Sequence, residues 1–218
     1  MFVRPNQFRN SKADVQIFYG GVKSWTKPLG VSQVYMMLIG GGSGGDGSTV
    51  GGNSGNITTW FGSAQNVPDF LVLNAGLPNT ANNTQGNQSA IAYSGSVTPA
   101  TNILIASGGN IGGAANTADT ATVFGNTGFY QNVLGQVGSA GVNLTASTTT
   151  FLSGGDTGGT VTGNYGYVAN STSSGFFQLQ PIIVGVGGSS NKGGIGCGSG
   201  SNNATGFGGD GLAVIITW

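Results

Sequence analysis

The residues that most often carry catalysis are scarce in this chain. It has no histidine and no glutamate, so neither a Ser-His-Asp nor a Cys-His arrangement can be built from it. The lone Cys197 has Lys192 as its one basic neighbour in sequence, which favours a small buried apolar side chain over an activated nucleophile.

Asp46, Asp156 and Asp210 each follow a Gly-Gly pair. Two carboxylates can hydrolyse a glycosidic bond, but glycine-aspartate is ordinary turn chemistry, and we expect no enzyme, no catalytic residue and no cofactor.

Two stretches come close to the calcium-binding nonapeptide of β-rolls, which sets one aspartate in a glycine-rich frame. Residues 41–49 match it except at the apolar position, where Ser48 stands, and residues 205–213 match it except at the first position. A β-roll completes its calcium sites with tandem copies, whereas these two stretches lie far apart in sequence. We expect no metal site, and the sequence leaves open whether Asp46 or Asp210 binds calcium.

The composition indicates a folded chain with an unusually neutral surface. The chain has 218 residues, 44 of them glycine, with 6% charged residues and a formal net charge of zero. Recurrent clusters of valine, isoleucine and leucine argue against disorder, and the length suits one all-β domain. Because so few charges produce little repulsion between copies, we expect a homo-oligomer.

Basic residues are concentrated near the N-terminus. Five of the six lie in the first 27 positions, namely Arg4, Arg9, Lys12, Lys23 and Lys27. Such a cluster suits either an arm that contacts phosphates or an N-terminus that docks on a partner subunit. We favour the second, because these charges are too few for packaging a genome, and expect no nucleic-acid partner. We place a basic N-terminal arm at residues 1–13 and a glycine-rich β-sandwich domain at residues 14–218.

The N-terminal residues carry no export signal. Residues 1–6 lack the apolar core that a signal peptide needs, and no apolar run approaches the ~18 residues of a membrane span. We therefore expect no membrane partner. The low content of charged residues suits an assembled or extracellular particle. Combined with the lack of an export signal, it is typical of proteins that assemble inside a cell and leave by lysis, as virion components do.

The elements that must position these residues read as short strands separated by glycine and asparagine turns. Residues 34–39 are apolar on both faces, which predicts a strand covered on both sides. Residues 15–19 and 22–26 flank Gly20-Gly21 and predict a hairpin with a two-residue turn. Further strands are expected at 56–61, 69–74, 102–106, 120–124, 148–152, 176–180, 182–186 and 212–217. Together they predict an all-β, jelly-roll-like β-sandwich with long glycine-rich loops.

Two segments read differently from strands. Residues 40–55 contain almost no core-forming side chain, and glycines at 41, 44 and 47 follow a three-residue period that permits a packed polyproline-II-like helix. Val50-Gly51 breaks this period, which favours close-packed loops or weak edge strands whose backbones approach one another. Residues 128–136 place Phe129 and Val133 on one helical face and predict a helix of one or two turns.

The start of the domain carries a recognisable motif. Trp25, Lys27-Pro28 and Gly30-Val31, followed by the apolar strand into Gly40-Gly41-Gly42, resemble the start of the glycine-rich domain of bacteriophage tail-fibre and related virion proteins. Residues 60–62 and 208–218 are also similar to it, whereas about 75–185 match only loosely. The resemblance implies a β-rich, homo-oligomeric component exposed on the particle and often involved in host attachment. Tail fibres carry this domain at one end of a long chain, so a small spike, a capsid-decorating protein or a capsid subunit stays equally open.

The sequence thus favours a self-associating viral structural protein, located in the virion, that contacts other virion proteins and contributes to host attachment. Candidate loops for a host surface glycan are 79–89, 110–120 and 163–174, which would bind through many weak contacts summed by avidity. Tyr165 and Tyr167 lie in the third loop, although packing against glycine backbone is the favoured role for them. The alternative is a secreted glycine-rich module that binds calcium or, through threonine-rich stretches, ice.

Overall fold

The computed structural model describes most of the two ends of the chain and part of its middle. It describes residues 13–45, 52–81, 83–93, 102–111, 114–119, 127–135, 165–168, 182–186, 193, 195–196, 198–199 and 207–218, with the backbone alone for 102, 165–168 and 182–186. The predicted arm lies outside these residues except for Ala13. The strands expected at 120–124, 148–152 and 176–180 lie outside them as well.

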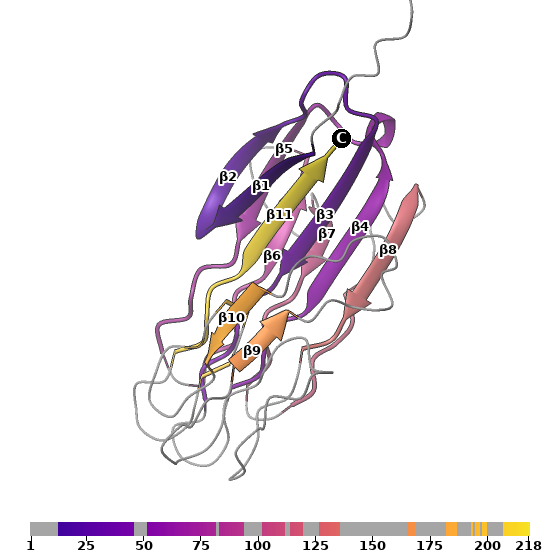
Figure 1. The fold of residues 1–218 in the computed structure, drawn as a ribbon. Coiled ribbons are helices and arrows are strands. Elements are labelled where there is room, and N and C mark those ends of the chain that lie inside the picture. The colour runs from indigo at the N-terminus through magenta and orange to yellow at the C-terminus, as the bar shows by residue number, and fades with distance from the viewer. Residues whose placement is uncertain are drawn as a thin grey trace, which may run out of the picture.

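Two antiparallel sheets face each other in a sandwich-like arrangement (Figure 1). One has five strands in the order β1-β11-β3-β4-β8, the other has four in the order β2-β5-β6-β7, and β9 and β10 form a separate pair. The bounds are β1 Asp14–Tyr19, β2 Gly21–Thr26, β3 Gln33–Ile39, β4 Ile57–Ser63, β5 Phe70–Ala75, β6 Ser89–Ala92, β7 Asn102–Ala106, β8 Gly128–Val133, β9 Tyr165–Val168, β10 Ile182–Val186 and β11 Leu212–Thr217. In the described residues the one helical element is the 3-10 turn η1, Ala64–Asn66. The predicted all-β class is confirmed.

β3 is the central strand of the fold, and both of its faces are buried. Its β-branched, aromatic and other apolar residues favour a strand, and the glycines that follow Ile39 end it. Alternate side chains enter two different clusters, with Val34, Met36 and Leu38 in the core between the sheets and Tyr35, Met37 and Ile39 on the outer face. The prediction of a strand covered on both sides is therefore confirmed.

The core between the two sheets is built around two tryptophans. Trp25 on β2 and Trp60 on β4 are both almost fully buried, and Leu71, Leu73 and Ile91 of the four-stranded sheet join them in one cluster. Burying each such side chain stabilises the fold by roughly 1.5–3 kcal/mol relative to leaving it exposed. This core fixes the two sheets relative to one another.

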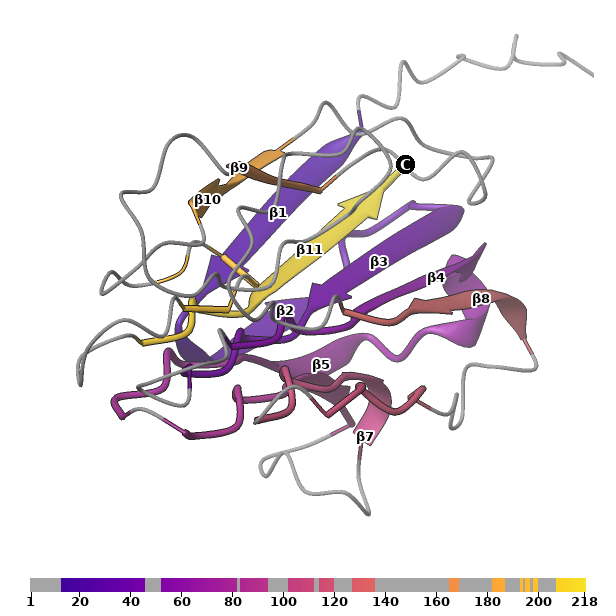
Figure 2. The ribbon, with the colours of Figure 1, turned by 90° about the horizontal axis from the view of Figure 1, so that it is seen from below.

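The outer face of the five-stranded sheet is also apolar across its width. Strand register places on it Val15, Ile17 and Tyr19 of β1, Leu212, Val214 and Ile216 of β11, Tyr35, Met37 and Ile39 of β3, Ile57, Thr59 and Phe61 of β4, and Phe129, Gln131 and Val133 of β8. Side chains on the central strands β11 and β3 are buried, whereas those on the edge strand β1 are half exposed. Figure 2 shows the small β9–β10 sheet on this side of the five-stranded sheet, opposite the four-stranded one.

The hairpin predicted for residues 15–26 is wrong, although both of its strands exist. β1 pairs with β11 in the five-stranded sheet, and β2 pairs with β5 in the four-stranded sheet. Gly20 and Gly21 have φ angles of 53° and 79°, so the glycines do adopt the positive values that the turn prediction required. The turn carries the chain from one sheet to the other instead of folding β2 back on β1.

The helix predicted at 128–136 is wrong, because residues 128–133 form the edge strand β8. A spacing of four residues between Phe129 and Val133 fits one helical face, but it also fits one face of a strand, where the period is two. Tertiary contacts decide between them. β8 pairs along β4, and the Phe129 and Phe61 rings stack with centroids 6.3 Å apart.

Besides β8, two further strands were not expected from the sequence. β6, Ser89–Ala92, has only four residues and begins inside the candidate loop 79–89. β9, Tyr165–Val168, lies inside the candidate loop 163–174 and pairs with β10 further along the chain. The backbone around Tyr165 and Tyr167 is therefore strand and not free loop. The side chains of β9, those of Tyr165 and Tyr167 included, lie outside what the structure describes.

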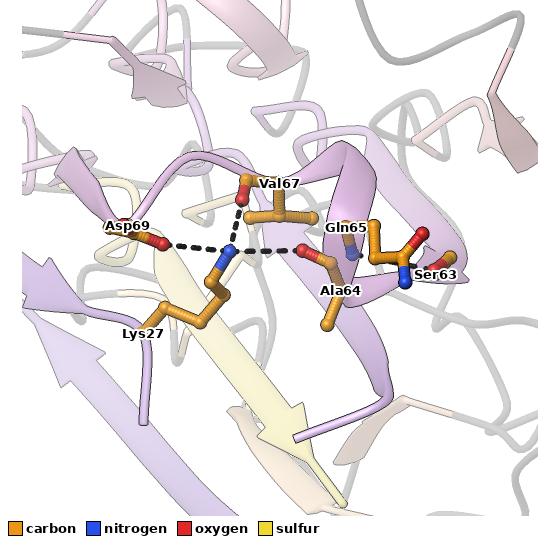
Figure 3. Close-up of polar contacts among 6 residues, drawn as sticks. All are labelled: Lys27, Ser63, Ala64, Gln65, Val67 and Asp69. Carbon is orange, nitrogen blue, oxygen red and sulfur yellow. Dashed lines mark hydrogen bonds and ion pairs between the residues drawn. The ribbon is translucent and has the colours of Figure 1, made fainter. Parts of the chain in front are cut away.

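The motif at the start of the domain, residues 25–31, is explained in part by the contacts of Lys27 (Figure 3). Its ammonium donates to the carbonyl oxygens of Ala64 and Val67 at 3.1 and 2.7 Å and pairs with the Asp69 carboxylate at 2.8 Å. These contacts use all three ammonium protons and satisfy carbonyls at η1. Gly30, with φ 81°, completes the turn into β3. Lys27 therefore joins β2 to the connection between β4 and β5.

Candidate functional site

Strands of both sheets end at one pole of the sandwich in glycine-rich segments. Residues 40–45 follow β3, residues 52–56 precede β4, residues 84–87 precede β6, residues 107–110 follow β7, and residues 207–211 precede β11. We call these segments, together with the described part of 193–199, the glycine bundle. In Figure 1 the bundle lies beyond the sheets, at the end of the molecule opposite the C-terminus.

The central segment of the glycine bundle, residues 40–45, is buried along its whole length and donates backbone hydrogen bonds to three neighbours in turn. The N–H groups of Gly40 and Ser43 bond to Asn56 and Asn53, those of Gly41 and Gly44 bond to Asn87 and Thr84, and that of Gly42 bonds to Gly209, all at N···O distances of 2.8–3.0 Å. A partner that recurs every third residue is expected for an extended helix with three residues per turn, as in polyproline II. The three-residue period of the glycines therefore has a structural counterpart in this segment.

The same three-residue step joins the other segments of the bundle. Gly52 and Gly55 donate to Ser199 and Gly196, and Gly193 and Gly196 donate to Phe207 and Asp210, at 2.7–2.8 Å. Buried backbone groups must find partners, and in the bundle each segment supplies partners for the next. The described part of the bundle is thus held mainly by main-chain hydrogen bonds, to which the side chains of Ser43, Asn79 and Ser199 add further ones.

Glycine is required at several positions of the bundle because the neighbouring backbone approaches too closely there for a side chain. A Cβ atom added at Gly208 would lie 1.9 Å from the carbonyl oxygen of Gly42, and one added at Gly198 would lie 1.8 Å from that of Gly52. Real Cβ atoms do not come within 3 Å of such atoms. The glycines are therefore fixed by close approach of neighbouring backbones.

Amide side chains form hydrogen bonds along one side of the bundle. The Asn116 amide donates to the carbonyl oxygen of Ser54 and to the side chain of Asn56, both at 2.9 Å, and its oxygen accepts from the N–H of Asn110. The amide of Asn53 also donates to that oxygen. Asn116 is buried, so this part of the candidate loop 110–120 is structural.

Asp119 is the acidic centre of this polar cluster. One carboxylate oxygen accepts from the Asn56 amide, the Ser107 N–H and the Asn132 amide at 2.9, 2.9 and 3.1 Å, and the other accepts from the Ser107 hydroxyl. Burial, followed by the charge of Asp119, raises the pKa of the Tyr130 phenol, and a hydrogen bond with Thr58 opposes this rise. The donors belong to several segments of the chain, so the Asp119 carboxylate links these segments through its hydrogen bonds.

The structure brings two of the three candidate loops together. The Gln85 amide donates to the side-chain oxygen of Asn110 at 3.2 Å, and Gly86 donates to the carbonyl oxygen of Gly109. Asn79 is buried and donates to Thr84 while accepting from Gly208. The loop ends are therefore attached to the bundle. The exposed residues between them are Thr80, Ala81, Asn83, Thr84, Gln85 and Asn87 in one loop, and Ile111, Ala114, Ala115, Thr117 and Ala118 in the other.

The residues that the sequence offered for metal or acid chemistry remain dispersed or undescribed. Asp46, Asp156 and Cys197 lie outside the described residues, and Asp210 lies in the bundle, where its carbonyl oxygen accepts from Gly196. Within the described ranges there is no group of three or more His, Cys, Asp or Glu that could hold a metal ion. Sequence reasoning missed Asp119, whose only signal was that it is one of very few acidic residues in a loop.

No family model matches this chain, and no curated protein is similar enough to it to serve as a relative. Among the residues that the structure describes, no helix is long and apolar enough to cross a membrane. The site is therefore characterised by its geometry: two loops attached to a glycine-rich base, whose described exposed side chains are uncharged and are polar mainly in loop 79–89.

Proposed function

We propose that this protein is a structural component of a virus particle, exposed on its surface, that self-associates and contacts the host through the loops at the glycine pole. The observation that supports this proposal is the attachment of loops 79–89 and 110–120 to the glycine bundle. Binding loops work best when a rigid scaffold positions them, because less conformational entropy is then lost on binding. The resemblance of the opening motif to phage tail-fibre domains agrees with this role.

The exposed polar residues, most of them in loop 79–89, favour a neutral, hydroxyl-rich ligand such as a surface glycan. Asn83, Gln85 and Asn87 each carry an amide that can both donate and accept hydrogen bonds. Thr80 and Thr117 each carry a hydroxyl with the same double capacity. No charged side chain stands among the described exposed residues of these loops. A single site of this kind binds weakly, so useful affinity requires many copies that bind together.

Binding to host cells provides the test of attachment. The protein, displayed in many copies on fluorescent beads, is expected to bind host cells, and enzymatic removal of surface glycans should abolish that binding. The double variant Thr80→Ala/Gln85→Ala should lower bead binding at least about tenfold, since avidity multiplies the loss at each site. The matched control is Ser24→Ala/Thr26→Ala on the exposed face of β2, which should bind like the wild type. Equal loss in both double variants would exclude the loops as the binding surface.

Location on the particle is tested separately by immunogold labelling of intact virions with an antibody against the protein. Labelling of the particle surface is expected. The alternative of a secreted calcium-binding module predicts a rise in the unfolding midpoint when calcium is added in excess, because a ligand that binds the native state stabilises it. A calcium-dependent midpoint without particle labelling would replace the virion proposal with this alternative.

A further inference from the structure

One side of the sandwich ends in two open strand edges. β1 is the last strand of the five-stranded sheet and β2 is the last strand of the four-stranded sheet, and they are consecutive along the chain (Figure 1). Among the described strands, none pairs with the outer edge of either. An open edge presents unpaired N–H and C=O groups and is a template for another strand.

Proteins usually protect such edges with a lysine, a proline, a bulge or a covering segment. β2 carries the exposed Lys23 at its centre, and the sheet edge at β7 has a register shift opposite Ile91 and Ala92. Side chains of the third edge, β8, bind Asp119 through Tyr130 and Asn132. Two of the four edges, β2 and β7, thus carry a protecting feature, and Asp119 is attached to the inner face of a third, β8.

Among the residues that the structure describes, none gives β1 any of these features. It contains no lysine, arginine or proline, and it pairs with β11 over six consecutive positions without a register shift. Val15, Ile17 and Tyr19 are 52%, 46% and 52% exposed and share one face of the strand. A regular, apolar, unprotected edge is the feature that natural sequences avoid unless it is used for pairing.

The exposed stripe continues an apolar face that the protein already buries. Val15, Ile17 and Tyr19 lie directly beside Ile216, Val214 and Leu212 of β11, which are buried in the outer cluster. Covering the stripe would therefore extend an existing cluster by three side chains. Each half-exposed residue of this size would contribute about 1 kcal/mol when fully covered.

We propose that β1 is the surface through which two copies of this chain associate, by antiparallel pairing of β1 with β1 of the second copy. With Ile17 opposite its own counterpart, Val15 lies opposite Tyr19, Gln16 opposite Phe18, and Asp14 opposite Gly20. β-Branched and aromatic residues are favourable cross-strand neighbours, and no like charges face each other. The pairing keeps both apolar stripes on the same face and joins the two five-stranded sheets into one.

A second copy fits this edge better than an unrelated strand. The stripe is self-complementary about a two-fold axis through Ile17, and the commonest homo-oligomers are dimers of this symmetry. A formal net charge of zero adds no long-range repulsion between copies. A shift by one residue would place the two stripes on opposite faces, so odd shifts of the register are disfavoured. This inference deepens the self-association included in the proposed function.

The test is the mass of the protein in solution, measured by sedimentation velocity over a range of concentrations. The wild type is expected to be a dimer or a multiple of it. Ile17→Lys, which places charges opposite each other at the centre of the pairing, should weaken dimerisation at least about 100-fold, since like charges and lost burial act together. The matched control Val22→Lys changes an exposed β-branched residue on the neighbouring strand β2 and should leave dimerisation unchanged. Circular dichroism and thermal unfolding verify that both variants fold.

Cross-linking supplies an independent measurement. In a Cys197→Ser background, Ile17→Cys should form a disulfide-linked dimer under mild oxidation, whereas Val22→Cys should stay monomeric on a denaturing gel. If the wild type associates but Ile17→Lys still does so and Ile17→Cys does not cross-link, the β1 interface is wrong while self-association stands. If the wild type is monomeric at every concentration, both the interface and the self-association fail. Cell binding and particle labelling then still decide the attachment and virion proposals.

Discussion

At the scale of single residues, Asp119 links several segments of the chain through its hydrogen bonds. Its carboxylate collects donors from Asn56, Ser107 and Asn132, which belong to three different segments. Asp119→Ala leaves several part-buried donors without this acceptor and should lower the free energy of unfolding by about 2–3 kcal/mol. Asp119→Asn keeps one oxygen for the three N–H donors, and its amide can donate to the Ser107 hydroxyl, so we expect a loss of about 1 kcal/mol. Urea denaturation of both variants measures the difference, and equal stability of wild type and Asp119→Ala would refute this role.

At the scale of elements, the glycine segments behave as a structure in their own right. Gly208 and Gly41 both lie in the bundle, but an added Cβ would lie 1.9 Å from a carbonyl oxygen at Gly208 and 3.0 Å from one at Gly41. Gly208→Ala must therefore displace backbone and should destabilise the protein by at least about 3 kcal/mol, whereas Gly41→Ala needs only a small adjustment and should cost about 1 kcal/mol. Thermal unfolding of the two variants tests this order. If both alanines are tolerated equally, the bundle is looser than the backbone distances indicate.

At the scale of the whole molecule, the absence of histidine determines how stability responds to pH near neutrality. The chain has no histidine, so the free energy of unfolding should stay almost constant between about pH 5 and 9. Burial raises the pKa of Tyr35 to about 12 from its ordinary value of 10.0. Because the folded-state value is the higher one, the stability this group contributes is fully present below pH 10 and is lost as the pH rises to about 12.

This loss should amount to about 2–3 kcal/mol for Tyr35 alone, from a difference of about two pKa units. Tyr35→Phe should therefore lose less stability than the wild type between pH 10 and 12, measured by urea denaturation at each pH. The control Tyr93→Phe replaces an exposed tyrosine and should follow the wild-type curve. A wild-type curve that fell already between pH 6 and 8 would contradict the flat profile.

The fold was largely predictable where a continuous apolar run marks a buried strand, and less so elsewhere. Strands such as β3 and β11 are predicted by runs of apolar residues next to glycine. β8 could not be separated from a helix, because a four-residue spacing of apolar side chains satisfies both periods. The cluster around Asp119 could not be predicted at all, since its donors come from residues 56, 107 and 132 and only folding brings them together.

What the sequence determined by itself is the β class, most strand positions and the neutral polar character, because these depend on the chemistry of each residue and its nearest neighbours. Tertiary structure alone decided which strands pair, as β1 with β11 and β2 with β5, and how the glycine segments meet. The physical reason is that every backbone N–H and C=O group is alike, and glycine adds no side chain to select a partner. The glycines permit close approach, and the two sheets to which they are tied decide which backbones approach.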